Sequence, residues 1–217
     1  MLVNALVGAA LAVVVLSLVD EGTSLRKSTK QRVLWRVVWR SMRMRHVWPA
    51  PFVLAGAALL GWLLSTYVGG VLNWGWWSAM GGTGNVVLGN NSDLFGAAGS
   101  QWVSRIMLVV LALLMPNLVT WEERVFRRGI ERRSALGRSM WAGAFGLIHL
   151  VAGIPLWAAL ALTVVGLYCS HVYMKTYRAL APTRGDAVAR RRAVLESTCA
   201  HLGFNSLGIL VAALSLA

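Results

Sequence analysis

The chain has 217 residues, of which 57% are hydrophobic and only 13% are charged, and its formal net charge is +13. This composition is too apolar for a soluble globular domain and leaves little length for a domain outside the membrane, so it indicates a polytopic membrane protein. The positive charge does not indicate nucleic-acid binding, because the basic residues fall in clusters between apolar runs, as the positive-inside rule produces in cytoplasmic loops. The clusters occupy residues 26–45, 124–138 and 175–192.

The apolar runs predict an all-α bundle of about six transmembrane helices. The first run, residues 2–19, has no positive charge before it and a basic cluster after it, so it is expected to insert with its N-terminus outside. A cleaved signal peptide would require a positively charged start, which this run lacks. Basic and apolar residues alternate over residues 25–48, which favours a helix on the anionic cytoplasmic leaflet over a solvated loop. Pro49 and Pro51 then open a second span, residues 52–71.

Residues 69–99 are rich in Gly, Trp, Asn and Ser and contain no Lys or Arg, so this loop is expected outside the cell. Its Trp74, Trp76 and Trp77 are typical of an interfacial aromatic belt, and the alternative is a carbohydrate or peptide site built on them. The third span, residues 102–123, returns the chain to the cytoplasm.

Three further runs complete the bundle. The fourth and fifth spans, residues 140–153 and 156–173, are short for a full crossing and are separated by a break at Ile154-Pro155. The last helix is expected to begin near Ala187, to enter the membrane around Thr198 and to end outside at Ala217.

Two adjacent carboxylates, Glu122 and Glu123, close the third span. A carboxylate costs about 2.5–3.5 kcal/mol at the centre of a transmembrane helix and less toward the interface, so such residues face partners or water-filled cavities. Glu123 lies one helical turn before Arg127, which can neutralise it, whereas Glu122 has Phe126 at that spacing. The pattern predicts one carboxylate tied to a cation and one free for chemistry. The alternative is that both carboxylates only mark the membrane boundary.

Other polar side chains lie inside the fourth and last spans. His149 follows Phe145 by one turn, so the two share a helix face. Thr198, His201 and Asn205 are spaced i, i+3, i+7 and are expected to project from one stripe. Together with the free carboxylate, these spans supply two imidazoles and an amide, which are expected to converge near the cytoplasmic side.

This set of groups suits amide hydrolysis without a covalent intermediate. A carboxylate and a neutral imidazole can hold and deprotonate a water, and a second imidazole and an amide can donate to the oxygen that becomes negative. Cys169 and Cys199 lie in apolar segments and are interpreted as core thiols. Two histidines and a glutamate could also bind zinc, but the H-E-x-x-H pattern is absent, so neither a metal nor another cofactor is expected.

Three short motifs lie on these spans in a fixed order. Residues 122–127 fit EExxxR, residues 145–149 fit FxxxH and residues 201–205 fit HxxxN. In this combination the chain resembles the CPBP family of intramembrane proteases, also called Abi, which includes the CAAX prenyl endopeptidases. The resemblance divides the chain into an N-terminal membrane region, residues 1–101, which carries no family motif, and a CPBP-like catalytic core, residues 102–217.

The resemblance implies a metal-independent endopeptidase that hydrolyses a peptide bond with a glutamate-activated water. Carried over by position, the implied roles are water activation by Glu122 and His149, an oxyanion hole formed by His201 and Asn205, and support from Glu123, Arg127 and Phe145.

The expected partners are membrane lipids, a peptide or membrane-protein substrate and, beyond these, a membrane-protein partner; nucleic acid is not expected. The expected location is a bacterial cell membrane, with both termini outside and an active site that opens toward the cytoplasm. Two other classes stay open. One is a non-catalytic scaffold or immunity subunit that retains the fold, and the other is a transporter, because intramembrane Glu and His also form proton relays.

Overall fold

The computed structural model describes residue 16, residues 19–79 and residues 92–215, and no strand occurs among them. Residues 19–27 are helical, and the later α-helices are α2 (Thr29–Ser41), α3 (Met44–Val47), α4 (Ala50–Leu63), α5 (Trp76–Ala79), α6 (Ser92–Phe126), α7 (Ala135–Ile148), α8 (Leu156–Ala161), α9 (Thr163–Arg184) and α10 (Asp186–Ser215). A π-helical turn (Leu64–Val68) and short 3-10 helices (Gly70–Asn73, Ile130–Arg132, His149–Ala152) connect them. The protein is an all-α helical membrane bundle.

Four helices in the described part of the chain are long and apolar enough to cross a membrane. They are Met44–Val68, Ser104–Arg132, Leu156–Arg184 and Asp186–Leu214, and they contain most of the predicted second, third, fifth and last spans. The prediction of a short fifth span was wrong, because the helix continues through the polar residues after Tyr173 to Arg184. The predicted fourth span is α7, which has 14 residues before the 3-10 turn. Nearly all of the predicted first span and residues 80–91 of the external loop lie outside the described residues.

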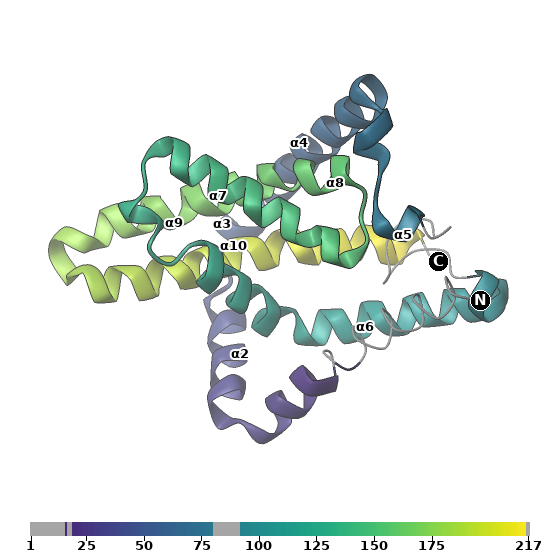
Figure 1. The fold of residues 1–217 in the computed structure, drawn as a ribbon. Helices are drawn as coiled ribbons and strands as arrows, with labels where there is room; N and C mark the ends of the chain where they lie inside the picture. The colour runs from purple at the N-terminus through teal and green to yellow at the C-terminus, as the bar shows by residue number, and fades with distance from the viewer. Residues whose placement is uncertain (1–15, 17–18, 80–91, 216–217) are drawn as a thin grey trace.

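Helix α10 lies at the centre of the bundle and packs against α9, α6, α4, α3 and α2 (Figure 1). Helices α9 and α10 pack along each other as an antiparallel pair joined at Gly185, whose positive φ of +75° glycine adopts far more readily than other residues. The main core joins Ala57 of α4 to Phe126, Val165 and Phe204. Helix α4 of the N-terminal region therefore shares a core with α6, α7, α9 and α10.

Helix α2 confirms the predicted helix between residues 25 and 48, and in Figure 1 it runs across α6 and α10 rather than along them. One face of α2 is buried, since Val38 packs against Cys199 and Leu202. The indole N–H of Trp35 also donates to the carbonyl of Leu113 at 3.0 Å. Helix α2 is therefore attached to the bundle through packing and a hydrogen bond.

An ionic cluster holds α3 against α10. The buried carboxylate of Glu196 lies 2.8 Å from both the Nη2 of Arg45 and the Nε2 of His46, and 3.0 Å from the Nη2 of Arg192. The backbones also approach closely, because a Cβ at Gly203 would lie 2.5 Å from the carbonyl oxygen of His46. The contact with α3 therefore holds α10 in place at Gly203, which lies between His201 and Asn205 of the polar stripe.

The tryptophan-rich segment packs on the turn after α7. The indole of Trp76 donates to the carbonyl of Leu150 at 2.7 Å, and the amide of Leu156 donates to the carbonyl of Trp74 at 2.9 Å. Trp77 is only 2% exposed, so its assignment to a lipid-facing belt was wrong; of the three, Trp74 is the one that is clearly exposed. The segment holds the end of α7 in place.

Replacement of Gly146 by Ala is expected to destabilise the protein strongly. A Cβ there would lie 2.2 Å from the carbonyl oxygen of Ala159, so α7 would have to move away from α8, and overpacking of this kind typically costs about 1–3 kcal/mol or more. Gly143→Ala on the same helix is the matched control. Its Cβ would meet no atom of the described residues within 4 Å, and alanine in a helix gains up to about 1 kcal/mol over glycine. Thermal unfolding of both variants in detergent tests this, and equal melting temperatures would contradict it.

Candidate functional site

The two glutamates lie on the last turns of α6, which continues through them to Phe126 before the chain turns at Gly129. The side chain of Glu123 is fully buried, whereas that of Glu122 is 22% exposed. The helix thus separates two adjacent carboxylates into a buried one and a partly accessible one.

Glu123 is held from three sides. The Nε of Arg127 lies 3.4 Å from its Oε2, which confirms the predicted pair one helical turn apart. The hydroxyl of Ser197 donates to the same oxygen, and the Nδ1 of His201 lies 3.0 Å from Oε1. Arg127 is itself fully buried, and its guanidinium carbon lies 4.8 Å from the centre of the Phe145 ring. Glu123 and Arg127 thus form a fully buried ion pair next to Glu122.

Glu122 faces two imidazoles. Its Oε1 lies 4.0 Å from the Nε2 of His149, and its Oε2 lies 3.6 Å from the Nε2 of His201. Both distances exceed that of a direct hydrogen bond, and a separation of this size is one that a water can bridge. Among the described side chains, Glu122 therefore pairs with no arginine or lysine, as its spacing predicts.

In each histidine, a contact made by the second ring nitrogen, Nδ1, sets the orientation of the ring. The Nδ1 of His149 lies 2.9 Å from the carbonyl oxygen of Phe145, to which only an N–H can donate. A neutral His149 therefore presents an unprotonated Nε2 to Glu122. His201 bridges the two carboxylates, with Nδ1 toward Glu123 and Nε2 toward Glu122.

Phe145 separates the two imidazoles. Its ring makes edge contacts with His149 and His201 at centroid distances of 5.1 and 5.3 Å, and with Phe126 at 5.5 Å. The ring itself is 1% exposed. The three motifs that are far apart in the sequence therefore meet around one buried aromatic side chain.

Two other residues of the α10 stripe make their hydrogen bonds away from the glutamate pair. The amide nitrogen of Asn205 lies 3.3 Å from the sulfur of Met115 on α6. The hydroxyl of Thr198 donates to the carbonyl of Val194 within its own helix. Ser197, which the sequence analysis missed, supplies the contact to the glutamate pair instead. Its position four residues before His201 is the signal that could have found it.

One group of potential metal ligands occurs among the described residues. Glu123, Cys169 and His201 offer donor atoms that lie within 4.8 Å of one another. The chemistry of the site does not favour a cation there, because Arg127 and Ser197 already contact the carboxylate and the guanidinium would repel a metal ion. Cys169 and Cys199 are both buried free thiols, which confirms their interpretation as core cysteines.

The fold and this cluster define an integral membrane protein in which two glutamates and two histidines from three helices meet at one partly buried site. Comparison of the chain with protein-family models, with curated proteins and with solved structures found no match.

Proposed function

We propose that the protein is an intramembrane endopeptidase of the CPBP type. The observation that carries this proposal is the placement of the partly exposed Glu122 carboxylate between the Nε2 atoms of His149 and His201, at 4.0 and 3.6 Å. A carboxylate and an imidazole acceptor at such distances can together hold one water. General-base catalysis requires that the base lies within hydrogen-bonding distance of the water it deprotonates. The resemblance of the three motifs to the CPBP family supports the same reaction.

In the proposed reaction, water bridges Glu122 and His149 and attacks the carbonyl carbon of a peptide bond. Glu122 accepts the proton as the new C–O bond forms, and the carbonyl oxygen becomes negative. The tetrahedral intermediate then breaks its C–N bond, and Glu122 returns the proton to the leaving nitrogen. The net result is addition of one water across one amide, with no covalent enzyme intermediate.

His201 is placed to stabilise the negative oxygen. Its Nδ1 faces Glu123, so Nε2 can donate to the oxyanion only when the ring carries both protons. Glu123 holds the orientation of the ring through Nδ1, in the way that a buried aspartate orients a catalytic histidine. Asn205 can add a second donor if its amide rotates away from Met115.

The substrate in this proposal is a peptide or a membrane protein, and no cofactor takes part. The protein is proposed to lie in a bacterial cell membrane, with both termini outside and the site opening toward the cytoplasm, where the positive-inside rule places the basic segments.

The proposal is tested by comparing newly formed protein termini in host membranes that contain equal amounts of wild type or Glu122→Gln. Termini that appear only with wild type would identify the protein as a protease and name its substrate and bond. Identical termini, together with a partner retained by both forms, would overturn the protease assignment in favour of a scaffold. Loss of a transport activity in Glu122→Gln with identical termini would favour a transporter.

Chelators are expected to leave cleavage unchanged, because the proposed base is a carboxylate and the potential ligand group is already occupied by Arg127 and Ser197. The measurement is the cleavage rate of the purified protein after dialysis against EDTA and 1,10-phenanthroline. Loss of activity that zinc restores would contradict the metal-independent mechanism.

A further inference from the structure

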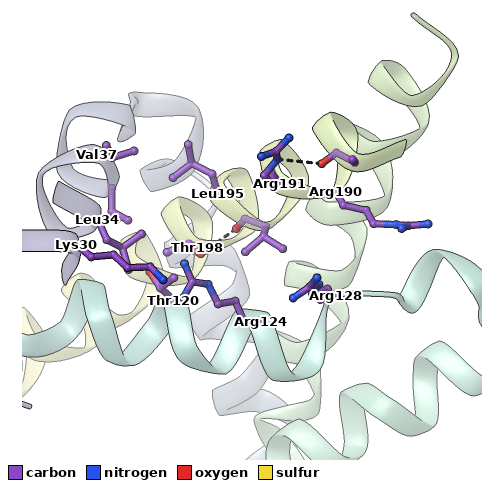
Figure 2. Close-up of a pocket in the computed structure, with 13 residues that line it drawn as sticks. Lys30, Leu34, Val37, Thr120, Arg124, Arg128, Arg190, Arg191, Leu195 and Thr198 are labelled. Atoms are coloured by element: carbon purple, nitrogen blue, oxygen red, sulfur yellow. Dashed lines mark hydrogen bonds between the residues drawn. The ribbon is translucent and has the colours of Figure 1, made fainter. Parts of the chain in front are cut away.

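A separate cavity lies between α2, α6 and α10 (Figure 2). Its volume is about 740 Å³, within the range of about 300–1,000 Å³ that ligand pockets have. Apolar side chains line much of it, including Leu34 and Val37 of α2 and Val194 and Leu195 of α10. None of the residues of the glutamate cluster lines this cavity, so it is not part of the proposed active site.

The polar part of the lining is strongly basic. It includes Lys30, Arg124, Arg128, Arg190 and Arg191, and no acidic side chain of the described residues lines the cavity. Arg190 is paired with acidic residues outside the cavity, at 2.6 and 3.1 Å. Within the described residues, no hydrogen bond or ion pair engages the side chains of Lys30, Arg124 and Arg128. Three exposed cations beside an apolar surface favour a ligand that is both anionic and apolar.

The basic groups of α2 and α6 gather at the same place. Lys30 and Arg124 point toward one another in Figure 2, and together they also line a neighbouring cavity of about 540 Å³. The two positive charges repel each other, and an anion bound between them would attract both. The two cavities meet at this pair of cations.

We propose that the cavity binds an anionic phospholipid. The phosphate contacts Lys30, Arg124 and Arg128, and an acyl chain covers the apolar wall of α2 and α10. Basic pockets between transmembrane helices are suited to anionic headgroups, and α6 and α10 are both helices that can cross the membrane. A soluble phosphate would leave the apolar wall uncovered. Lipid binding at this cavity is separate from the proposed protease activity and does not require catalysis.

Native mass spectrometry of the purified full-length chain tests the site. The chain is titrated with palmitoyl-oleoyl phosphatidylglycerol or with the zwitterionic phosphatidylcholine of the same acyl chains. Wild type is expected to bind one phosphatidylglycerol at least about tenfold more tightly than phosphatidylcholine, since several basic residues face the anionic headgroup. The double variant Arg124→Gln/Arg128→Gln is expected to lose at least about tenfold in phosphatidylglycerol affinity and to keep its phosphatidylcholine affinity.

The double variant Lys175→Gln/Arg178→Gln is the matched control. It removes the same charge from exposed positions of α9 that do not line the cavity, so phosphatidylglycerol affinity should stay near that of wild type. Equal affinities of wild type for the two lipids, or an equal loss in both double variants, would overturn the proposal. Displacement of the bound lipid by glycerol phosphate or by an acidic peptide at similar concentrations would instead assign the site to a soluble anion or to a peptide.

A photoactivatable phosphatidylglycerol provides a second readout on wild type alone, which stays informative if the Arg124→Gln/Arg128→Gln variant does not fold. Cross-linked peptides are expected from α2, the end of α6 and the start of α10. Cross-links confined to other helices would overturn the site.

Discussion

Replacement of Glu122 by Gln is expected to lower the cleavage rate constant by a factor of about 10²–10⁴, the range that general-base catalysis contributes. Glutamine keeps the size and the hydrogen-bonding shape of the side chain but cannot accept the proton of the attacking water. The measurement is kcat and KM of the purified protein on a peptide that contains the cleavage site found in host membranes. The loss should appear in kcat, because the base acts on the water and not on the substrate.

The control for Glu122→Gln removes a carboxylate elsewhere. Asp186→Asn changes an exposed residue at the start of α10 that pairs with Arg190 and lies far along the helix from His201. It should keep the wild-type kcat. His149→Ala and His201→Ala are expected to lose cleavage as well, with the melting temperature retained more fully for the partly exposed His149. Full activity of Glu122→Gln would show that another group is the base.

The parts of this site that could be predicted are those that local spacing decides. Glu123 and Arg127 are one turn apart, so any continuing helix brings them together, and the structure shows the pair at 3.4 Å. The free Glu122 follows from the same argument, because Phe126 occupies its i+4 position. Hydropathy located most of four long helices for a similar reason, since length and composition are properties of a single segment.

The other features of the site depend on contacts between helices. Ser197 and Thr198 lie four and three residues before His201, so both share its face, and only the rotation of α10 against α6 determines which hydroxyl meets Glu123. The bridging position of His201 between two carboxylates depends on the same rotation. Trp77 shows a related limit, because a tryptophan that packs inside the protein has the same local sequence signal as one that faces lipid.

Replacement of Glu123 by Gln is expected to destabilise the fold by about 3–5 kcal/mol, the cost of breaking a buried ion pair and leaving one charge uncompensated. The remaining charge would be Arg127, which has no exposed surface and whose Nε and Nη2 make no hydrogen bond in the described structure. At about 2–4 °C per kcal/mol for a chain of this size, the melting temperature should fall by roughly 10 °C. Thermal unfolding in detergent measures the change.

The double variant Glu123→Gln/Arg127→Met separates the loss of the pair from the loss of packing. Methionine fills part of the buried volume without a charge, and replacement of a whole buried ion pair by apolar groups is often neutral or stabilising. The double variant should therefore be more stable than Glu123→Gln alone. It should still cleave poorly, because the Nδ1 of His201 loses the carboxylate that orients its ring toward Glu122. A double variant with wild-type kcat would show that Glu123 serves stability alone, whereas one no more stable than Glu123→Gln would show that the uncompensated charge of Arg127 is not the source of the instability.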